Sequence, residues 1–520
     1  MPAAPRPPMP KLPPFALAEA RSARNRPLYL LIFFLLFAAP LFASHAAFLN
    51  LPFFWDEHGQ FIPTALDLLR KGLWVARSTI PNVHPPGVEA YLVLWYKLFG
   101  YSIVITRVAM LLIASAGLLI TFLLAIELCQ DSKGAPAFLP PLFLLASPLF
   151  FTQSMMAQLD MPAMVLSLLV LLLFIKRRYA AAAAVSVALV LVKETGVVVP
   201  FVLFLVLLGR GRFRAASYFI APALALFAWL FVLHRATGYW LGNPDFAHYN
   251  IAYALHPVRM TLSFIRRIYY LFFAEFRWIG TFVLVGAGWY AKPFGRRRWR
   301  VTVAVALASI ILVSVLGGAE LERYLLPVLP LFYIAVALAL TATPKWLSIT
   351  VIGTLLAGLI VSLFWNPPYP FPFENNFAMV HFVRLQQTAA EFAERNFANR
   401  TIATAWPYTS ALANPDYGFV DHKLNVVETN DFHPDSIQKL PPERFDVLIV
   451  YTRTWAPANG VIAIPEVRRF LAHFYEWQPD ISPEQCADLG LHEAISWRAG
   501  GQEITIYVRP GVHASQTVHL

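Results

Sequence analysis

Long apolar runs separated by short polar stretches dominate residues 28 to 365 of this chain. A helix needs about 20 apolar residues to cross a hydrocarbon core about 30 Å thick. Basic clusters stand at the ends of several runs, at 176–178, 210–214 and 296–300, and such clusters mark cytoplasmic loops. The pattern predicts a polytopic α-helical membrane protein with about eleven spans, an inner N-terminus and an outer C-terminus.

The expected spans follow the apolar runs and end where charged residues begin. They lie at residues 28–48, 102–128, 138–151, 161–175, 180–192, 195–208, 215–233, 271–290, 301–316, 325–340 and 346–365. Residues 1–27 become a cytoplasmic tail. The loop between the first two spans, residues 51–100, lies outside and is the longest loop in this arrangement.

The pattern changes beyond residue 366. Charged residues become frequent, apolar runs shorten to strand length at 446–451 and 503–508, and residues 380–397 show helical periodicity. Residues 366–520 are therefore expected to form a small soluble α/β domain on the outer face, after a transmembrane domain at 28–365.

Composition agrees with the pattern and excludes other classes of protein. With 58% hydrophobic residues and a mean hydropathy of +0.57, the chain is not an ordinary soluble globule. The net charge of +11 comes largely from the basic clusters at span ends, so nucleic acid is not an expected partner. Cys129 and Cys486 fall on opposite sides of the membrane in this topology, and no disulfide is expected.

Candidate chemistry begins directly beyond the first span, at Trp55-Asp56-Glu57-His58. Consecutive helical residues point about 100° apart, so one carboxylate can act as a general base while the other positions a helix, a metal or an arginine. The alternative is an interfacial pair that serves solubility. His84-Pro85-Pro86-Gly87 in the same loop is a rigid turn, with or without a further function.

Further ionisable residues lie at membrane depth or at the outer mouths of the spans, where they are functional candidates. Lys193 suits a phosphate, and the guanidinium of Arg323 suits an anionic head group. The alternatives are a salt-bridged helix tip at Lys193-Glu194 and an interfacial anchor at Arg323-Tyr324. No His-x-x-x-His spacing supports a zinc site, so no metal ligand is assigned.

Five short motifs together resemble the GT-C superfamily of polytopic glycosyltransferases, in its protein mannosyltransferase and aminoarabinose transferase-like branch. The motifs are Asp56-Glu57, His84-Pro85-Pro86-Gly87, Asp160-Met161-Pro162, Lys193-Glu194-Thr195-Gly196 and Glu322-Arg323-Tyr324-Leu325-Leu326-Pro327. Their order and topological side carry the resemblance, which covers residues 28–365. It implies inverting transfer of a sugar from a polyprenyl-phosphate-linked donor to an acceptor hydroxyl, at the outer face of the inner (plasma) membrane.

The resemblance also implies roles for individual residues. Asp56 becomes the catalytic base and Glu57 its catalytic partner in shaping the site. The donor phosphate and sugar are expected to contact His84, Arg107, Asp160, Lys193, Glu194, Arg323 and Tyr324. A divalent metal stays open as a cofactor and is not required, and the acceptor is a glycan, a lipid or a protein.

Two other functions are compatible with a polytopic chain. A transporter or flippase of lipid-linked saccharides usually shows an internal repeat and charges in both halves of the membrane, and neither is visible here. A scaffold whose outer domain binds partners leaves the many charges at the outer mouths unexplained.

Overall fold

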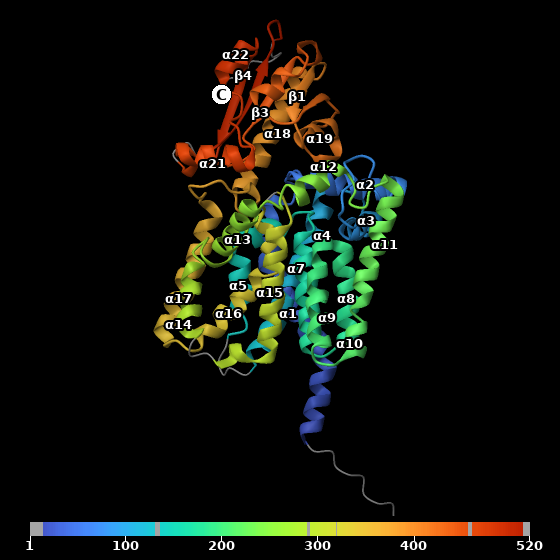
Figure 1. The fold of residues 1–520 in the computed structure, drawn as a ribbon, viewed down its shortest axis with the longest axis vertical. Helices are drawn as coiled ribbons and strands as arrows, with labels where there is room; N and C mark the ends of the chain where they lie inside the picture. The colour runs from blue at the N-terminus through green and yellow to red at the C-terminus, as the bar shows by residue number, and fades with distance from the viewer. Residues whose placement is uncertain (1–13, 131–135, 289–291, 319, 456–459, 513–520) are drawn as a thin grey trace, which may run out of the picture.

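The computed structural model describes residues 14–130, 136–288, 292–318, 320–455 and 460–512. Its helices stand side by side in the lower part of Figure 1, and the strands lie together above one end of them.

Within these ranges, five helical segments are long and apolar enough to cross a membrane. They are the Pro27–Phe48 part of α1 (Pro14–His45) with η1 (Ala46–Phe48), α4 (Ile103–Cys129), α10 and α11 (Phe213–Ser217 and Ile220–Thr237), α15 (Arg297–Val315) and α17 (Lys345–Phe364). The chain is therefore a multi-pass membrane protein.

Shorter apolar helices stand among the five long ones. They are α5 (Leu139–Ala146), α6 (Pro148–Gln153), α7 (Asp160–Ile175), α8 (Tyr179–Val192), α9 (Val198–Leu208), α14 (Trp278–Gly288) and α16 (Leu329–Leu340). Each coincides with an apolar run that the sequence analysis assigned to a span. The total of about eleven spans stays a prediction.

Charged residues lie where these short helices begin or end. Asp160 opens α7, and Lys193 ends α8 in an extended conformation with φ −149°. The short turn η3 (Glu194–Val197) then leads into α9, and η6 (Glu322–Leu325) leads toward α16. Polar side chains at these helix ends stay out of the hydrocarbon and can converge on one face.

The connections on that face are partly helical. The loop at residues 51–100, which the sequence predicts to lie outside and which is called the first outer loop below, contains η2 (Glu57–Phe61), α2 (Ile62–Lys71) and α3 (Gly87–Phe99). The connection from α11 to α14 contains α12 (Pro244–Ala247), η4 (His248–Ala252) and α13 (Pro257–Phe272). In Figure 1, α2, α12 and α13 lie between the tall helices and the strands.

A five-stranded sheet with the order β2-β1-β3-β5-β4 forms after residue 400. Strands β1 (Thr401–Ala405), β2 (Asn425–Thr429) and β3 (Val447–Tyr451) are parallel. Strands β5 (Gln502–Val508) and β4 (His492–Ala499) add an antiparallel hairpin beside β3. The strand-length runs 446–451 and 503–508 coincide with β3 and β5.

Helices surround this sheet. They are α18 (Ala378–Phe397), α19 (Tyr408–Ala413), α20 (Pro434–Gln438), α21 (Pro465–Tyr475) and α22 (Pro483–Asp488). α18 coincides with the periodic segment 380–397, and in Figure 1 α21 lies just above α13.

The sheet-bearing part packs against the first outer loop. Arg70 of the loop forms an ion pair with Asp416 at 2.6 Å, and the Tyr101 hydroxyl donates to the Asp416 carbonyl at 2.6 Å. Gly59 lies against the ring of Trp406, which directly follows β1. The outer loop therefore joins the two parts of the chain.

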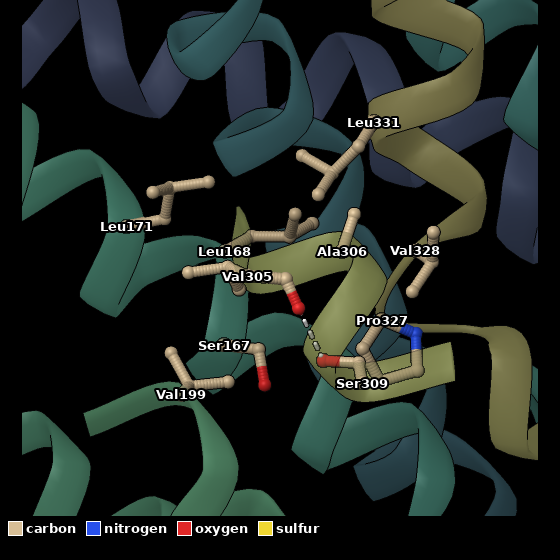
Figure 2. Close-up of a pocket in the computed structure, with 10 residues that line it drawn as sticks. All are labelled: Ser167, Leu168, Leu171, Val199, Val305, Ala306, Ser309, Pro327, Val328 and Leu331. Carbon is tan, nitrogen blue, oxygen red and sulfur yellow. Dashed lines mark hydrogen bonds between the residues drawn. The ribbon is translucent and has the colours of Figure 1, made fainter. Parts of the chain in front are cut away.

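A small cavity separates α7, α9, α15 and α16 within the helical part (Figure 2). Its volume is about 10 Å³, which is near the minimum for one water. Ser309 lines it but donates its hydroxyl to the Val305 carbonyl at 2.9 Å. This cavity is a packing gap between helices and has no room for a substrate.

Gly59 tests the contact between the outer loop and the sheet. A Cβ atom at this position would lie 2.6 Å from Cζ2 of Trp406, so Gly59→Ala forces apart two packed elements. We expect a loss of about 1–3 kcal/mol, measured as a lower thermal unfolding midpoint of the purified protein in detergent. Gly353→Ala in α17 is the control, because no atom lies within 4 Å of its Cβ position. Equal midpoints for the two variants would contradict this packing.

Candidate active site

A cavity of about 1670 Å³ lies between the helical part and the sheet. It is larger than most small-molecule sites, which measure about 300–1,000 Å³. Seven of the nine site residues expected from the sequence line it, namely Asp56, His84, Asp160, Lys193, Glu194, Arg323 and Tyr324. The structure therefore gathers residues from the first outer loop, α7, the α8–α9 turn and η6 on one wall.

Arg323 is the centre of the charged wall. Its Nη2 lies 2.5 Å from Oδ2 of Asp56, its Nε 3.1 Å from Oδ2 of Asp160, and its Nη1 2.6 Å from Oε2 of Glu374. Burial opposes the charge of Arg323, but the three carboxylates outweigh it and raise the pKa of Arg323 well above its ordinary value. The guanidinium therefore stays charged.

Lys193 extends the same network. Its ammonium donates to Oδ1 of Asp160, so Asp160 bridges the two cations. The Lys193 ammonium also lies 4.3 Å from the centre of the Tyr324 ring, a favourable cation–π geometry. Two cations thus stand close together on a cavity wall.

Asp56 differs from the other carboxylates of the network in its accessibility. Its side chain is 15% exposed, whereas those of Asp160 and Glu374 are 5% and 3% exposed. In the part of the chain that the structure describes, its ion pair uses Oδ2 alone. Oδ1 is thus left for a ligand in the cavity.

Glu57 and Arg107 lie behind the wall rather than on it. Their side chains are 0% and 1% exposed, and Oε1 of Glu57 lies 2.5 Å from Nη1 of Arg107. Glu57 also accepts the backbone N–H groups of Ala157 at 2.6 Å and Phe54 at 2.8 Å. Arg107 therefore does not line the cavity, unlike Arg323 and Lys193, and its charge is matched by Glu57.

His84 and Glu194 form a second contact across the cavity wall. Nδ1 of His84 lies 2.8 Å from Oε2 of Glu194, which joins the first outer loop to the α8–α9 turn. His58, the neighbour of Glu57, is instead enclosed. Burial lowers the pKa of His58 to about 3 and keeps its ring neutral.

Glu374 is a site residue that the sequence analysis missed. It lies in η7 (Phe373–Asn375), beyond the last apolar run and outside the motifs that carry the resemblance. Its Oε1 is buried with no hydrogen-bond partner in the described structure. The pKa of Glu374 is raised to about 7: burial is the largest cause, Asp56 and Asp160 also raise it, and Arg323 lowers it. An acid inside an otherwise apolar and proline-rich stretch was the available signal.

A second group of charges lines the cavity farther from Asp56. Nη2 of Arg266 lies 2.6 Å from Oε1 of Glu322, and Nη1 lies 3.9 Å from Oε2 of Glu320. Asn375 donates to the other oxygen of Glu322 at 3.1 Å. This group ties α13 to η6 and to the segment that carries Glu374.

In the ranges that the structure describes, no group of three His, Cys, Asp or Glu side chains is placed to hold a metal ion. The carboxylates nearest one another, Asp56, Asp160 and Glu374, converge on Arg323. A guanidinium thus occupies the place that a cation would take.

Fold and cavity together define a polytopic membrane protein with a charged site beneath a small sheet. No family model matches the chain, and no curated protein matches it. The chain is similar to the crystal structure of ArnT from Cupriavidus metallidurans bound to undecaprenyl phosphate. That likeness covers 94% of this chain and 99% of that chain, with 14% identity and a TM-score of 0.55.

The crystal structure of the same protein in the apo state is also similar. That likeness covers 92% of this chain and 99% of that chain, with 14% identity and a TM-score of 0.52. ArnT is an aminoarabinose transferase of the GT-C superfamily. The chain therefore shares its fold with this membrane glycosyltransferase, as the resemblance implied, whereas the total of eleven spans and the domain bounds at 28–365 and 366–520 stay predictions.

The buried ion pair between Glu57 and Arg107 allows a test of how the cavity wall is supported. Glu57→Gln leaves the charge of Arg107 uncompensated in a buried place, which costs about 3–5 kcal/mol. We expect a lower thermal unfolding midpoint. Asp416→Asn removes the carboxylate from the more exposed pair with Arg70 and is expected to cost about 1 kcal/mol or less. Similar losses for both variants would contradict the structural role of Glu57.

Glu374 gives a pH-dependent test. Its pKa rises from 4.5 to about 7 on folding, so folding favours its protonated form. The stability that it contributes is full below about pH 4.5 and is lost as the pH rises through about 7. Glu374→Gln does not titrate. The difference in unfolding midpoint, wild type minus Glu374→Gln, should therefore fall between about pH 5 and pH 8. A constant difference would rule out the elevated pKa.

Proposed function

We propose that this protein is a glycosyltransferase that moves a sugar from a polyprenyl-phosphate-linked donor to an acceptor hydroxyl, at the outer face of the inner membrane. One observation carries the proposal: an accessible carboxylate, Asp56, and two cations, Arg323 and Lys193, share one wall of a large cavity. The chemistry of glycosyl transfer requires such a base and such cations side by side.

Asp56 is the base in this reaction. A hydroxyl is a weak nucleophile, and a carboxylate that accepts its proton accelerates attack by roughly 10²–10⁴-fold. The acceptor oxygen forms a bond to the anomeric carbon while the bond from that carbon to the phosphate oxygen breaks. A single displacement of this kind inverts the configuration, and Arg323 fixes the orientation of the Asp56 carboxylate.

Arg323 and Lys193 stabilise the phosphate that leaves. Charge develops on the phosphate oxygens as the bond breaks, and cations placed beforehand lower the barrier. Three carboxylates face these two cations when the site is empty, so the donor phosphate must replace a carboxylate contact. Glu374 can release Arg323 by taking up a proton, because burial raises its pKa to about 7.

The apolar part of the cavity suits the polyprenyl chain of the donor. Side chains from α11, α13 and α15 line it, among them Leu226, Leu230, Leu262, Ile265, Leu312 and Val313. ArnT, which has the same fold, was crystallised with undecaprenyl phosphate. A phosphate at Arg323 with its lipid along these helices is consistent with both observations.

The remaining expected residues support this site. Glu57 and Arg107 hold the start of η2 and thereby the position of Asp56, and His84 with Glu194 joins the loop to the turn that carries Lys193. The partners are the lipid-linked donor, the membrane, and an acceptor glycan, lipid or protein. A divalent metal is not needed for these steps.

Asp56→Asn separates chemistry from donor binding. We expect sugar transfer by the purified enzyme to fall roughly 10²–10⁴-fold, because the acceptor proton loses its base. Binding of undecaprenyl phosphate should stay at least as tight, since Arg323 loses one competing carboxylate. Asp245→Asn, which alters another carboxyl on the cavity wall, should retain turnover. Wild-type turnover in Asp56→Asn would refute the base assignment, and translocation of a lipid-linked saccharide without transfer would favour a flippase.

A further inference from the structure

The three parallel strands of the sheet end at the cavity. Trp406 directly follows β1, Arg453 lies two residues beyond β3, and His433 lies four residues beyond β2. All three residues line the cavity. Ligands of open α/β sheets bind outside the carboxyl ends of the parallel strands, so this sheet presents its usual binding edge to the site.

Trp55 connects that edge to the proposed base. It precedes Asp56 in the chain, and its ring centre lies 6.4 Å from that of Trp406 at an interplanar angle of 89°. The backbone of Trp55 has φ 30°, a strained value for a bulky residue. The packing of the Trp55 ring against Trp406 and Phe382 holds this conformation and fixes an aromatic corner beside Asp56.

Arg453 is the cation of this corner. Its guanidinium lies 5.9 Å from the centre of the Trp55 ring. The other arginines on the cavity wall, Arg266 and Arg323, are ion-paired at 2.6 Å and 2.5 Å. No hydrogen bond or ion pair joins Arg453 to another residue that the structure describes. The carboxyl of Asp480 lies within electrostatic range of Arg453 but forms no hydrogen bond or ion pair with it, so the guanidinium fork is left for an anionic ligand.

We propose that Trp55, Trp406 and Arg453 form the acceptor subsite, and that the acceptor is a saccharide bearing a carboxylate or phosphate group. This inference rests on the proposed function, because it places the acceptor hydroxyl at Asp56. Aromatic rings pack against the C–H faces of sugar rings, and a guanidinium pairs with an anionic oxygen in two-point geometry. An uncharged sugar or a peptide uses only part of this corner.

The subsite separates acceptor from donor in space. Arg323 and Lys193 lie on the helical part beside Asp56, whereas Arg453 and Trp406 belong to the sheet. An acceptor held between Trp55 and the strand ends approaches Asp56 from the side opposite the membrane helices. The donor phosphate, held by Arg323, lies instead on the side of the helical part.

Binding measurements without donor test the subsite. The probes are methyl β-glucuronide, glucose 6-phosphate, methyl β-glucoside and inorganic phosphate, each titrated into the full-length protein in detergent and followed by saturation-transfer NMR. We expect the two charged sugars to bind at least about tenfold tighter than methyl β-glucoside, because only they place an anionic group against the guanidinium of Arg453. Inorganic phosphate alone should bind more weakly than glucose 6-phosphate. The ratio of the two charged sugars distinguishes a carboxylate acceptor from a phosphate acceptor.

Variants of Arg453 complete the test. Arg453→Gln should remove the preference for charged sugars, and Arg453→Lys should retain part of it because the charge remains. Arg498→Gln is the matched control, since Arg498 on β4 is a solvent-exposed arginine of the same sheet. The proposal is overturned if Arg453→Gln binds the charged sugars as the wild type does, or if methyl β-glucoside or inorganic phosphate binds as well as they do.

A parallel measurement keeps this inference distinct from the proposed function. Undecaprenyl phosphate should bind Arg453→Gln and wild type equally, because Arg323 and Lys193 are unchanged. A loss of undecaprenyl phosphate binding in Arg453→Gln with charged-sugar binding intact would assign Arg453 to the donor and overturn the acceptor subsite. Errors in the base or donor assignments would instead appear in the turnover of Asp56→Asn. That turnover is measured separately from these binding experiments.

Discussion

The guanidinium of Arg323 is the contact on which the arrangement of the site depends. It joins Asp56 of the first outer loop, Asp160 at the start of α7 and Glu374 beyond the last long helix. Buried charges are costly unless they are paired, so the guanidinium stabilises the close approach of these three segments. Without it, three carboxylates would repel one another and the cavity wall would open.

Part of the site could be predicted from the sequence. Apolar runs located the helices, because each span must be apolar to enter the hydrocarbon. Charged residues at helix ends stood out against that background, and the cavity gathers Asp56, Asp160, Lys193 and Arg323. The pairing of charged residues could not be predicted from the sequence. Arg107 lies 50 residues from Glu57, and only the packed structure shows that the two neutralise each other behind the wall.

Glu374 is a site residue that could not be identified from the sequence. It lies in an apolar, proline-rich stretch outside the motifs that carry the resemblance, and its importance arises from burial against Arg323. The sequence analysis likewise gave the sheet no role, because its strands are ordinary and its binding edge is a property of strand direction. Trp406, His433 and Arg453 are separated by more than 45 residues end to end, and only parallel pairing brings them to one edge.

The cavity therefore has two walls of different origin. Buried helix ends, where charge can be held in a fixed place at low dielectric, provide a rigid base and phosphate-suited cations. Strand ends and their loops tolerate substitution more readily, and they face the acceptor side in the proposed arrangement. Gly59 and Trp55 are the contacts between the two walls that lie nearest Asp56 in the chain, and Arg70 and Tyr101 add polar contacts to Asp416. A change at the strand ends therefore alters acceptor choice without moving the donor charges only if these contacts are kept.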